Sequence, residues 1–137
     1  MRVFLDANIL FSAAKSDGAV RALVRLLVER GHECWADAYV LAEARRNLLA
    51  KGPEALRVLD ALLPHLRLAA AAPPAAVPAY EQAWLPEKDR PVLAAAIRLR
   101  CDALVTGDRT HFGAGYGRSF DGAMVHSPRS LAERLFA

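Results

Sequence analysis

The chain begins with an apolar run that ends in an acid. Residues 3–5, Val-Phe-Leu, are continuously apolar rather than alternating, and Asp6 follows them directly. An uninterrupted apolar run is typical of a strand covered on both faces, as in a parallel sheet. In open α/β sheets, sites form beyond the carboxyl ends of the strands. The first strand therefore predicts a parallel sheet and puts Asp6 at the edge where a site would form.

Strand-like and helix-like segments alternate along the rest of the chain. The patterns predict strands near residues 2–5, 32–36, 66–68, 103–106 and 124–126, and helices near 8–14, 20–30, 38–51, 54–63, 89–100 and 128–136. Such alternation implies right-handed βαβ crossovers. We expect an α/β fold, a three-layer α/β/α sandwich with a central, mainly parallel sheet of about five strands.

Residues 69–79 form the one biased stretch of the sequence, rich in alanine and proline. The prolines exclude a helix through Pro73 and Pro74, so we expect a connector there, followed by a short helix at 79–84. A domain boundary at this point would leave two pieces too small to form cores. Residues 1–137 are therefore expected to form a single domain.

Composition excludes several classes of protein. Hydrophobic residues make up 54% and charged residues 24%, which is a globular rather than a disordered balance. The two cysteines are too few for a disulfide framework and lack metal-binding spacing, so buried thiols in a reducing compartment are expected. No apolar run approaches the ~20 residues that a membrane helix needs, and Asp6 interrupts the only candidate for a secretory signal. We expect a cytoplasmic protein without a membrane partner.

Three further acids lie at informative positions of the predicted elements. Glu43 shares its helix face with residues 36, 40, 47 and 50, which are mostly apolar, so its carboxylate is predicted to point inward or into a cleft. Asp89 begins a helix. Asp108 follows the strand at 103–106 through a glycine that permits a tight turn. We therefore expect these three acids at the same sheet edge as Asp6.

Each acid also has an ordinary structural interpretation. Asp6 and Asp89 could be helix N-caps, and Glu43 could pair with Arg46 or Asn47 on the next turn of its helix. Four acids at one edge, however, would repel by about 3 kcal/mol for each pair at ~5 Å and an effective dielectric constant of ~20. Such a cluster predicts bound cations or raised pKa values.

The expected ligands also indicate which ion and which chemistry to expect. Carboxylates without cysteines or clustered histidines favour Mg²⁺ or Mn²⁺ over zinc. Such ions orient and deprotonate a water and stabilise a leaving oxygen, as in phosphodiester cleavage. The net charge is +3, from 18 Lys and Arg against 15 Asp and Glu. With four acids neutralised, the basic excess grows, which favours a polyanionic partner.

Four short motifs surround these acids. They read Val-Phe-Leu-Asp-Ala-Asn at 3–8, Val-Leu-Ala-Glu-Ala-Arg-Arg at 40–46, Asp-Arg-Pro-Val-Leu-Ala-Ala-Ala at 89–96 and Leu-Val-Thr-Gly-Asp-Arg-Thr-His-Phe at 104–112. In this order, and over essentially the whole chain, they resemble the PIN-domain family, most closely its small single-domain members such as the VapC toxin-type ribonucleases. The resemblance implies a Mg²⁺- or Mn²⁺-dependent endoribonuclease that hydrolyses RNA.

The resemblance also implies roles for individual residues and partners. The catalytic and metal-binding acids would be Asp6, Glu43, Asp89 and Asp108, with Asn8 and Thr106 as supports beside them. The number of ions, one or two, stays open. The chain could be the toxin of a toxin–antitoxin pair, or a homodimer. An apolar groove among the N-terminal helices would then receive an antitoxin segment or a second copy, although Ile9, Leu10, Phe11, Leu23 and Leu27 equally fit a core.

Basic residues near the third and fourth motifs are candidates for RNA binding through phosphate contacts. They are Lys88, Arg90, Arg109, His111 and Arg118. Their alternative interpretation is as solvated loop residues. His111 could instead transfer a proton, but a lone loop histidine is usually neither a ligand nor a base.

Two other classes of function account for part of the pattern. A catalytically silent PIN-like module would bind RNA or act as a scaffold, and it would have no need for all four acids. A phosphoacceptor receiver domain also clusters acids at strand ends. It requires paired acids after the first strand and a lysine after the last one, whereas this sequence has Ala7 and Asn8 and no such lysine. Metal-dependent RNA cleavage is the function that we expect.

Overall fold

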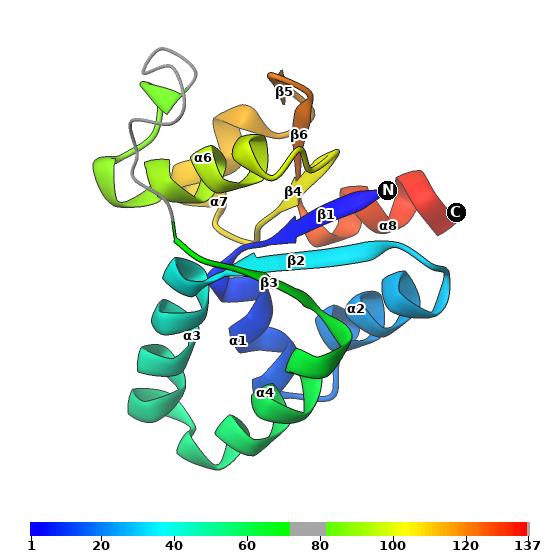
Figure 1. Ribbon diagram of the computed structural model, residues 1–137, viewed down its shortest axis with the longest axis vertical. Helices are drawn as coiled ribbons and strands as arrows, with labels where there is room; N and C mark the ends of the chain where they lie inside the picture. Colours follow the sequence, from blue (N-terminus) through cyan, green and yellow to red (C-terminus); the bar gives the residue numbers. More distant parts are fainter. Residues whose placement is uncertain (72–81, 137) are drawn as a thin grey trace.

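A six-stranded sheet forms the centre of the molecule, as Figure 1 shows for this computed structural model, which describes residues 1–71 and 82–136. The strands lie in the order β3-β2-β1-β4-β6-β5. Their bounds are Arg2–Leu5 (β1), Glu33–Asp37 (β2), Arg67–Ala69 (β3), Ala103–Val105 (β4), Ser119–Phe120 (β5) and Ala123–His126 (β6). Every pairing is parallel except that of β5 with β6. The mainly parallel α/β fold expected from the sequence is thus confirmed.

Helices cover both faces of this sheet. The α-helices are Ala7–Lys15 (α1), Ala19–Glu29 (α2), Ala38–Lys51 (α3), Leu56–Leu62 (α4), Arg90–Arg98 (α6), Arg109–Phe112 (α7) and Pro128–Phe136 (α8). Short 3-10 turns occur at Pro53–Ala55, Leu63–His65, Glu87–Asp89 and Gly113–Gly115. In Figure 1, α1, α2 and α4 lie on one side of the sheet and α6 and α7 on the other. The helix expected at 79–84, like the connector from residue 72 onward, lies mostly outside the described residues.

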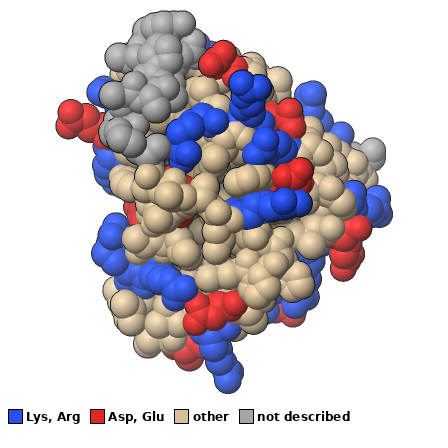
Figure 2. Space-filling view, viewed as in Figure 1, with Lys and Arg blue, Asp and Glu red and all other residues tan. Residues whose placement is uncertain are grey.

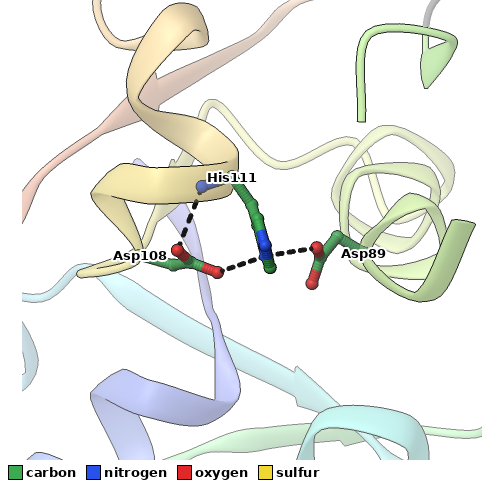
Figure 3. A group of neighbouring side chains, drawn as sticks. All are labelled: Asp89, Asp108 and His111. Carbon is green, nitrogen blue, oxygen red and sulfur yellow. Dashed lines mark hydrogen bonds and ion pairs between the residues drawn. The ribbon is translucent and has the colours of Figure 1, made fainter. Parts of the chain in front are cut away.

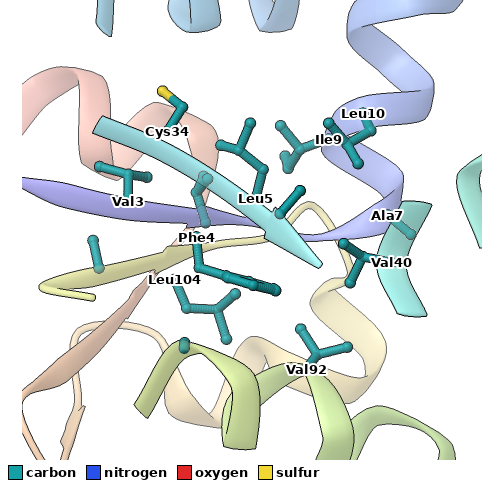
Figure 4. Packing of buried hydrophobic residues seen from close by; sticks show 14 of the residues in the cluster. Val3, Phe4, Leu5, Ala7, Ile9, Leu10, Cys34, Val40, Val92 and Leu104 are labelled. Atoms are coloured by element: carbon teal, nitrogen blue, oxygen red, sulfur yellow. The ribbon is translucent and has the colours of Figure 1, made fainter. Parts of the chain in front are cut away.

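The first strand is the centre of the core. Val3, Phe4 and Leu5 are completely buried, as expected for a strand covered on both faces. Figure 4 shows Phe4 pointing toward Val92 of α6, whereas Leu5 points to the opposite face, toward α1. Neighbouring residues of one strand therefore anchor the two helical layers.

The sheet has one strand more than the five expected. The additional strand, β5, is two residues long and joins β6 through a tight turn in which Asp121 (φ 48°) and Gly122 (φ 90°) both have left-handed backbones. An Asp-Gly pair in this conformation is typical of a hairpin. A two-residue strand is too short to show apolar periodicity, so the Asp-Gly pair of the turn was the part of the sequence that indicated a hairpin here.

Two differences concern helices. In place of the continuous helix expected at 54–63, the seven-residue helix α4 is flanked by 3-10 turns that contain Pro53 and Pro64. The segment after Asp108, expected to be a loop, forms the short helix α7. Within the described residues, the longest and most apolar helices still fall short of what a membrane crossing requires.

The register of the sheet determines where a site can form. Leu5 pairs with Val105, and Val105 pairs with His126, so the carboxyl ends of β1, β4 and β6 are level with one another. The residues that follow these strands therefore meet at one edge. Asp6 and Thr106 are the first of them.

Candidate metal centre

Asp6 ends β1 and is also the N-cap of α1. Its Oδ1 accepts a hydrogen bond from the Ala7 N–H at 2.7 Å, and its Oδ2 accepts from the Thr106 hydroxyl at 2.8 Å. Burial raises the pKa of Asp6 to about 6, although these two hydrogen bonds favour the charged form. The negative charges of Glu43 and Asp89 raise this pKa further. The N-cap interpretation is correct for Asp6, but it does not account for these neighbouring charges.

Asn8 and Thr106 connect the first and fourth motifs. Asn8 Nδ2 donates to Asp6 Oδ2 and to Thr106 Oγ1, both at 3.2 Å, and Asn8 Oδ1 accepts from the Gly107 N–H at 2.7 Å. Thr106 Oγ1 also accepts from the Asp108 N–H at 3.2 Å. A side chain at Gly107 would begin 3.3 Å from Asn8 Oδ1, so glycine permits this close approach. The two predicted supports therefore fix the backbone that carries Asp108.

Asp89 and Asp108 differ in how they are held. Asp108 caps α7, and its Oδ1 accepts from the His111 N–H at 3.1 Å. Asp89 occupies the N-cap position of α6, as one interpretation expected, but its side chain makes no capping hydrogen bond. Its side chain is 14% exposed. Burial raises the pKa of Asp89, and Asp108 raises it further, whereas the charges of His111 and Lys88 lower it.

The His111 imidazole lies between these two carboxylates, as Figure 3 shows. Its Nδ1 is 2.8 Å from Asp89 Oδ2 and 3.0 Å from Asp108 Oδ2. Neither contact is aligned as a hydrogen bond, and Asp89 Oδ2 and His111 Nδ1 are buried without a hydrogen-bond partner among the described residues. The alternative interpretation of His111 as a solvated loop residue is therefore wrong, because α7 turns this ring toward the two acids.

Glu43 reaches the same place from α3. The buried face of this helix consists of Val40, Ala44 and Leu48, and Glu43 lies beside it. The predicted face was only partly right, because Ala50 is exposed. Among the described residues, no ion pair joins Glu43 to an arginine, which removes the pairing alternative with that residue type.

All four predicted acids line one cavity of about 220 Å³. Its lining residues are Asp6, Ala7, Asn8, Glu43, Asn47, Lys88, Asp89, Gly107 and Asp108. Asn47 lies on the same helix face as Glu43, as the periodicity predicts, and it lines the cavity although no role in the site was predicted for it. Asp89, Asp108 and His111 each offer a ligand atom within 4.8 Å of the other two. This donor set, with two buried atoms that lack hydrogen bonds, fits a divalent metal ion.

Two tyrosines that the sequence did not single out as site residues hold the backbone beside the acids. The Tyr39 hydroxyl of α3 donates to the carbonyl oxygen of Lys88, next to Asp89. The Tyr116 hydroxyl donates to the carbonyl oxygen of Thr106 at 2.9 Å. Burial raises the pKa of both phenols. No local sequence pattern indicates these contacts, since each joins segments that only the fold brings together.

The predicted RNA-binding residues occupy different settings. Lys88 lines the cavity, whereas Arg90 Nε donates to the Leu85 carbonyl oxygen at 2.9 Å. Arg109 is exposed at the start of α7, and the Arg118 guanidinium lies 5.2 Å from the centre of the Phe120 ring. Figure 2 shows Lys and Arg spread over the visible face among acidic side chains, not gathered in one patch. Of the five candidates, Lys88 and His111 contact the site.

Comparison with known proteins identifies the family. Residues 2–110 match the family model of the PIN domain. The chain belongs to the PIN domain family. The family predicted from the four motifs is thus confirmed. A search among curated proteins gave no match.

Solved structures show the same fold at low sequence identity. A chain of VapBC2 from Rickettsia felis, bound to a DNA fragment from its promoter, is 17% identical with a TM-score of 0.68, and the match covers 93% of this PIN domain chain and 98% of that one. A chain of FitAB bound to an IR36 DNA fragment is 19% identical with a TM-score of 0.64, and the match covers 92% of this chain and 94% of that one. A chain of VapBC-1 from nontypeable Haemophilus influenzae is 13% identical with a TM-score of 0.62, and the match covers 94% of this chain and 99% of that one. At these identities the likeness establishes the fold.

Proposed function

We propose that this PIN domain is a cytoplasmic, metal-dependent endoribonuclease that hydrolyses RNA phosphodiester bonds. The observation that supports this most is the convergence of Asp6, Glu43, Asp89 and Asp108 on one cavity from four separate elements. Buried carboxylates are costly unless they are paired or bound to metal. Among the described residues, the one basic side chain at ion-pairing distance from any of these carboxylates is His111, which contacts Asp89 and Asp108. An arrangement that concentrates negative charge in this way favours binding of divalent cations.

The four acids would hold Mg²⁺ or Mn²⁺, because carboxylate oxygens are the ligands that these ions prefer. When bound, such an ion activates a water and stabilises the leaving oxygen of a phosphodiester. Asn8 and Thr106 orient the Asp6 carboxylate through hydrogen bonds to Oδ2. With these bonds in place, the carboxylate need not reorganise when a cation arrives.

Substrate binding would depend on basic residues around the cavity. Lys88 is the basic residue that lines it, so its ammonium group is placed to contact a phosphate near the acids. Arg109 and Arg118 are exposed farther along the same segment, after Asp108. We infer that they contact the flanking RNA backbone. Arg90, which donates to a backbone carbonyl, contributes to the local fold instead.

A protein partner is a further part of this proposal. VapBC2, FitAB and VapBC-1 contain chains with this fold. We infer that this chain is likewise the toxin of a toxin–antitoxin pair, restrained by an antitoxin protein. Four of the five apolar residues first considered for partner binding are unsuitable, since Ile9, Leu10, Leu23 and Leu27 are buried in the core. The fifth, Phe11, is partly buried and packs against that core.

The test compares cleavage of a structured RNA by the wild type and by Asp6→Asn, with Mg²⁺, with Mn²⁺ and with a chelator. We expect metal-dependent cleavage by the wild type and none by the variant. Asp121→Asn, at an exposed turn, is the matched control and should cleave normally. Equal cleavage by wild type and Asp6→Asn would overturn the proposal by pointing to another site or a contaminant. Absence of both cleavage and metal binding would favour the catalytically silent module.

A further inference from the structure

We propose that His111 is a direct nitrogen ligand of the divalent ion, and that it shifts the preference of the site from Mg²⁺ toward Mn²⁺. This inference rests on the proposed function, because His111 contacts Asp89 and Asp108, two of the acids of that cavity. It adds a nitrogen ligand to a site whose other four predicted ligands are carboxylate oxygens. Its consequence is a metal preference that carboxylates alone would not produce.

The contacts of His111 carry the argument. Nδ1 is 2.8 Å from one carboxylate oxygen and 3.0 Å from another, without the alignment of a hydrogen bond to either. Two ligands at ~2.1 Å from one ion and at right angles to each other lie about 3.0 Å apart. The distances of Nδ1 from Asp89 Oδ2 and Asp108 Oδ2 are therefore close to those between neighbouring ligands around one ion.

The local fold explains why the ring is placed there. Asp108 caps α7 by accepting from the His111 N–H through Oδ1, which leaves Oδ2 directed at the His111 ring. Residues three apart on a helix lie on the same face. A single turn of helix thus joins a carboxylate and an imidazole, and Asp89 meets them from the start of α6.

Ligand chemistry then predicts the ion. Mg²⁺ binds oxygen almost exclusively and retains several waters, whereas imidazole nitrogen is a good ligand for transition-metal ions. Mn²⁺ accepts both the carboxylates and the nitrogen. The competing interpretation is that the imidazole only balances two acids in the metal-free protein and moves aside when any ion binds. In that case its removal would strengthen binding of Mg²⁺ and Mn²⁺ alike.

Two measurements on the full chain separate these interpretations. Calorimetry gives the Kd for Mn²⁺ and for Mg²⁺ with the wild type, His111→Asn and the matched control His65→Asn, at an exposed histidine on another part of the chain. We expect His111→Asn to lower the preference for Mn²⁺ by about tenfold or more, and the control to leave it unchanged. Pulsed electron paramagnetic resonance of the Mn²⁺-loaded wild type should show coupling to a ¹⁴N nucleus, which His111→Asn should lose.

The wild-type spectrum needs no variant, so misfolding of His111→Asn cannot mask the result. If the wild type binds Mn²⁺ without nitrogen coupling, or if the variant binds both ions more tightly, the inference is overturned while the proposed function stands. If the wild type binds neither ion, the proposed function fails with it.

Discussion

The metal-free protein should become less stable as the pH rises, because Asp6 loses its proton. Replacing Asp6 by asparagine should remove this decrease in the free energy of unfolding. The Asp6 carboxylate is 4% exposed, and its pKa rises from 3.8 to about 6 on folding because burial disfavours the charged form. The folded state therefore holds the proton more tightly than the unfolded state. Stability from this group is greatest below pH 3.8 and falls as the pH rises through about 6.

The magnitude follows from the two pKa values. A rise from 3.8 to about 6 corresponds to about 3 kcal/mol in the free energy of unfolding. About 2 kcal/mol of this change falls between about pH 4.5 and about pH 7.5. Asparagine does not titrate, but its amide N–H groups would face donors from Ala7 or Asn8 and cost about 1–2 kcal/mol. That cost is the same at both pH values, so it cancels in the comparison.

Urea unfolding in a chelating buffer, followed by the fluorescence of Trp35 and Trp84, measures this difference. The stability of Asp6→Asn relative to wild type should rise by about 2 kcal/mol from the lower to the higher pH. The exposed control Asp121→Asn should show no such rise. At the higher pH, Mn²⁺ should stabilise the wild type and have little effect on Asp6→Asn. A relative stability that is the same at both pH values would refute the reasoning.

Two further substitutions test contacts around the site. Gly115→Ala should destabilise the protein by about 1–3 kcal/mol, because its new Cβ would overlap the Trp84 ring. The matched control Gly113→Ala meets nothing within 4 Å and should be nearly neutral in the same urea titration. Tyr39→Phe removes the hydroxyl that donates to the Lys88 carbonyl oxygen and should weaken Mn²⁺ binding by several-fold in calorimetry. An unchanged Kd would show that this bond does not position the neighbouring acid.

The sheet edge could be predicted because it depends on the chain directions of neighbouring strands. Asp6 and Asp108 each follow a parallel strand closely, and the carboxyl ends of such strands meet at one edge. Glu43 was harder, since a helix face is inferred from periodicity alone and Ala50 did not follow it. The strand β5 could not be predicted, because two residues are too few to show an alternating pattern. The Asp-Gly pair at 121–122 was the sequence signal for the turn that follows it.

The position of His111 could not be predicted from the sequence. A four-residue helix shows no periodicity, so the segment after Asp108 looked like a loop. Its ring contacts Asp89, which comes 22 positions earlier, before α6 and β4. Only the folded register brings these side chains to within 3 Å of each other.

Capping and metal binding are compatible tasks for the acids at strand ends. Asp6 and Asp108 each use Oδ1 to accept a backbone N–H, which fixes the carboxylate, while Oδ2 faces side chains of the site. Asp89 has no such side-chain bond, and the Tyr39 hydroxyl instead holds the carbonyl oxygen of Lys88 beside it. The orientation of two acids is thus built into their own helices, whereas that of Asp89 depends on another element. For this reason Tyr39→Phe should affect metal binding more than it affects folding.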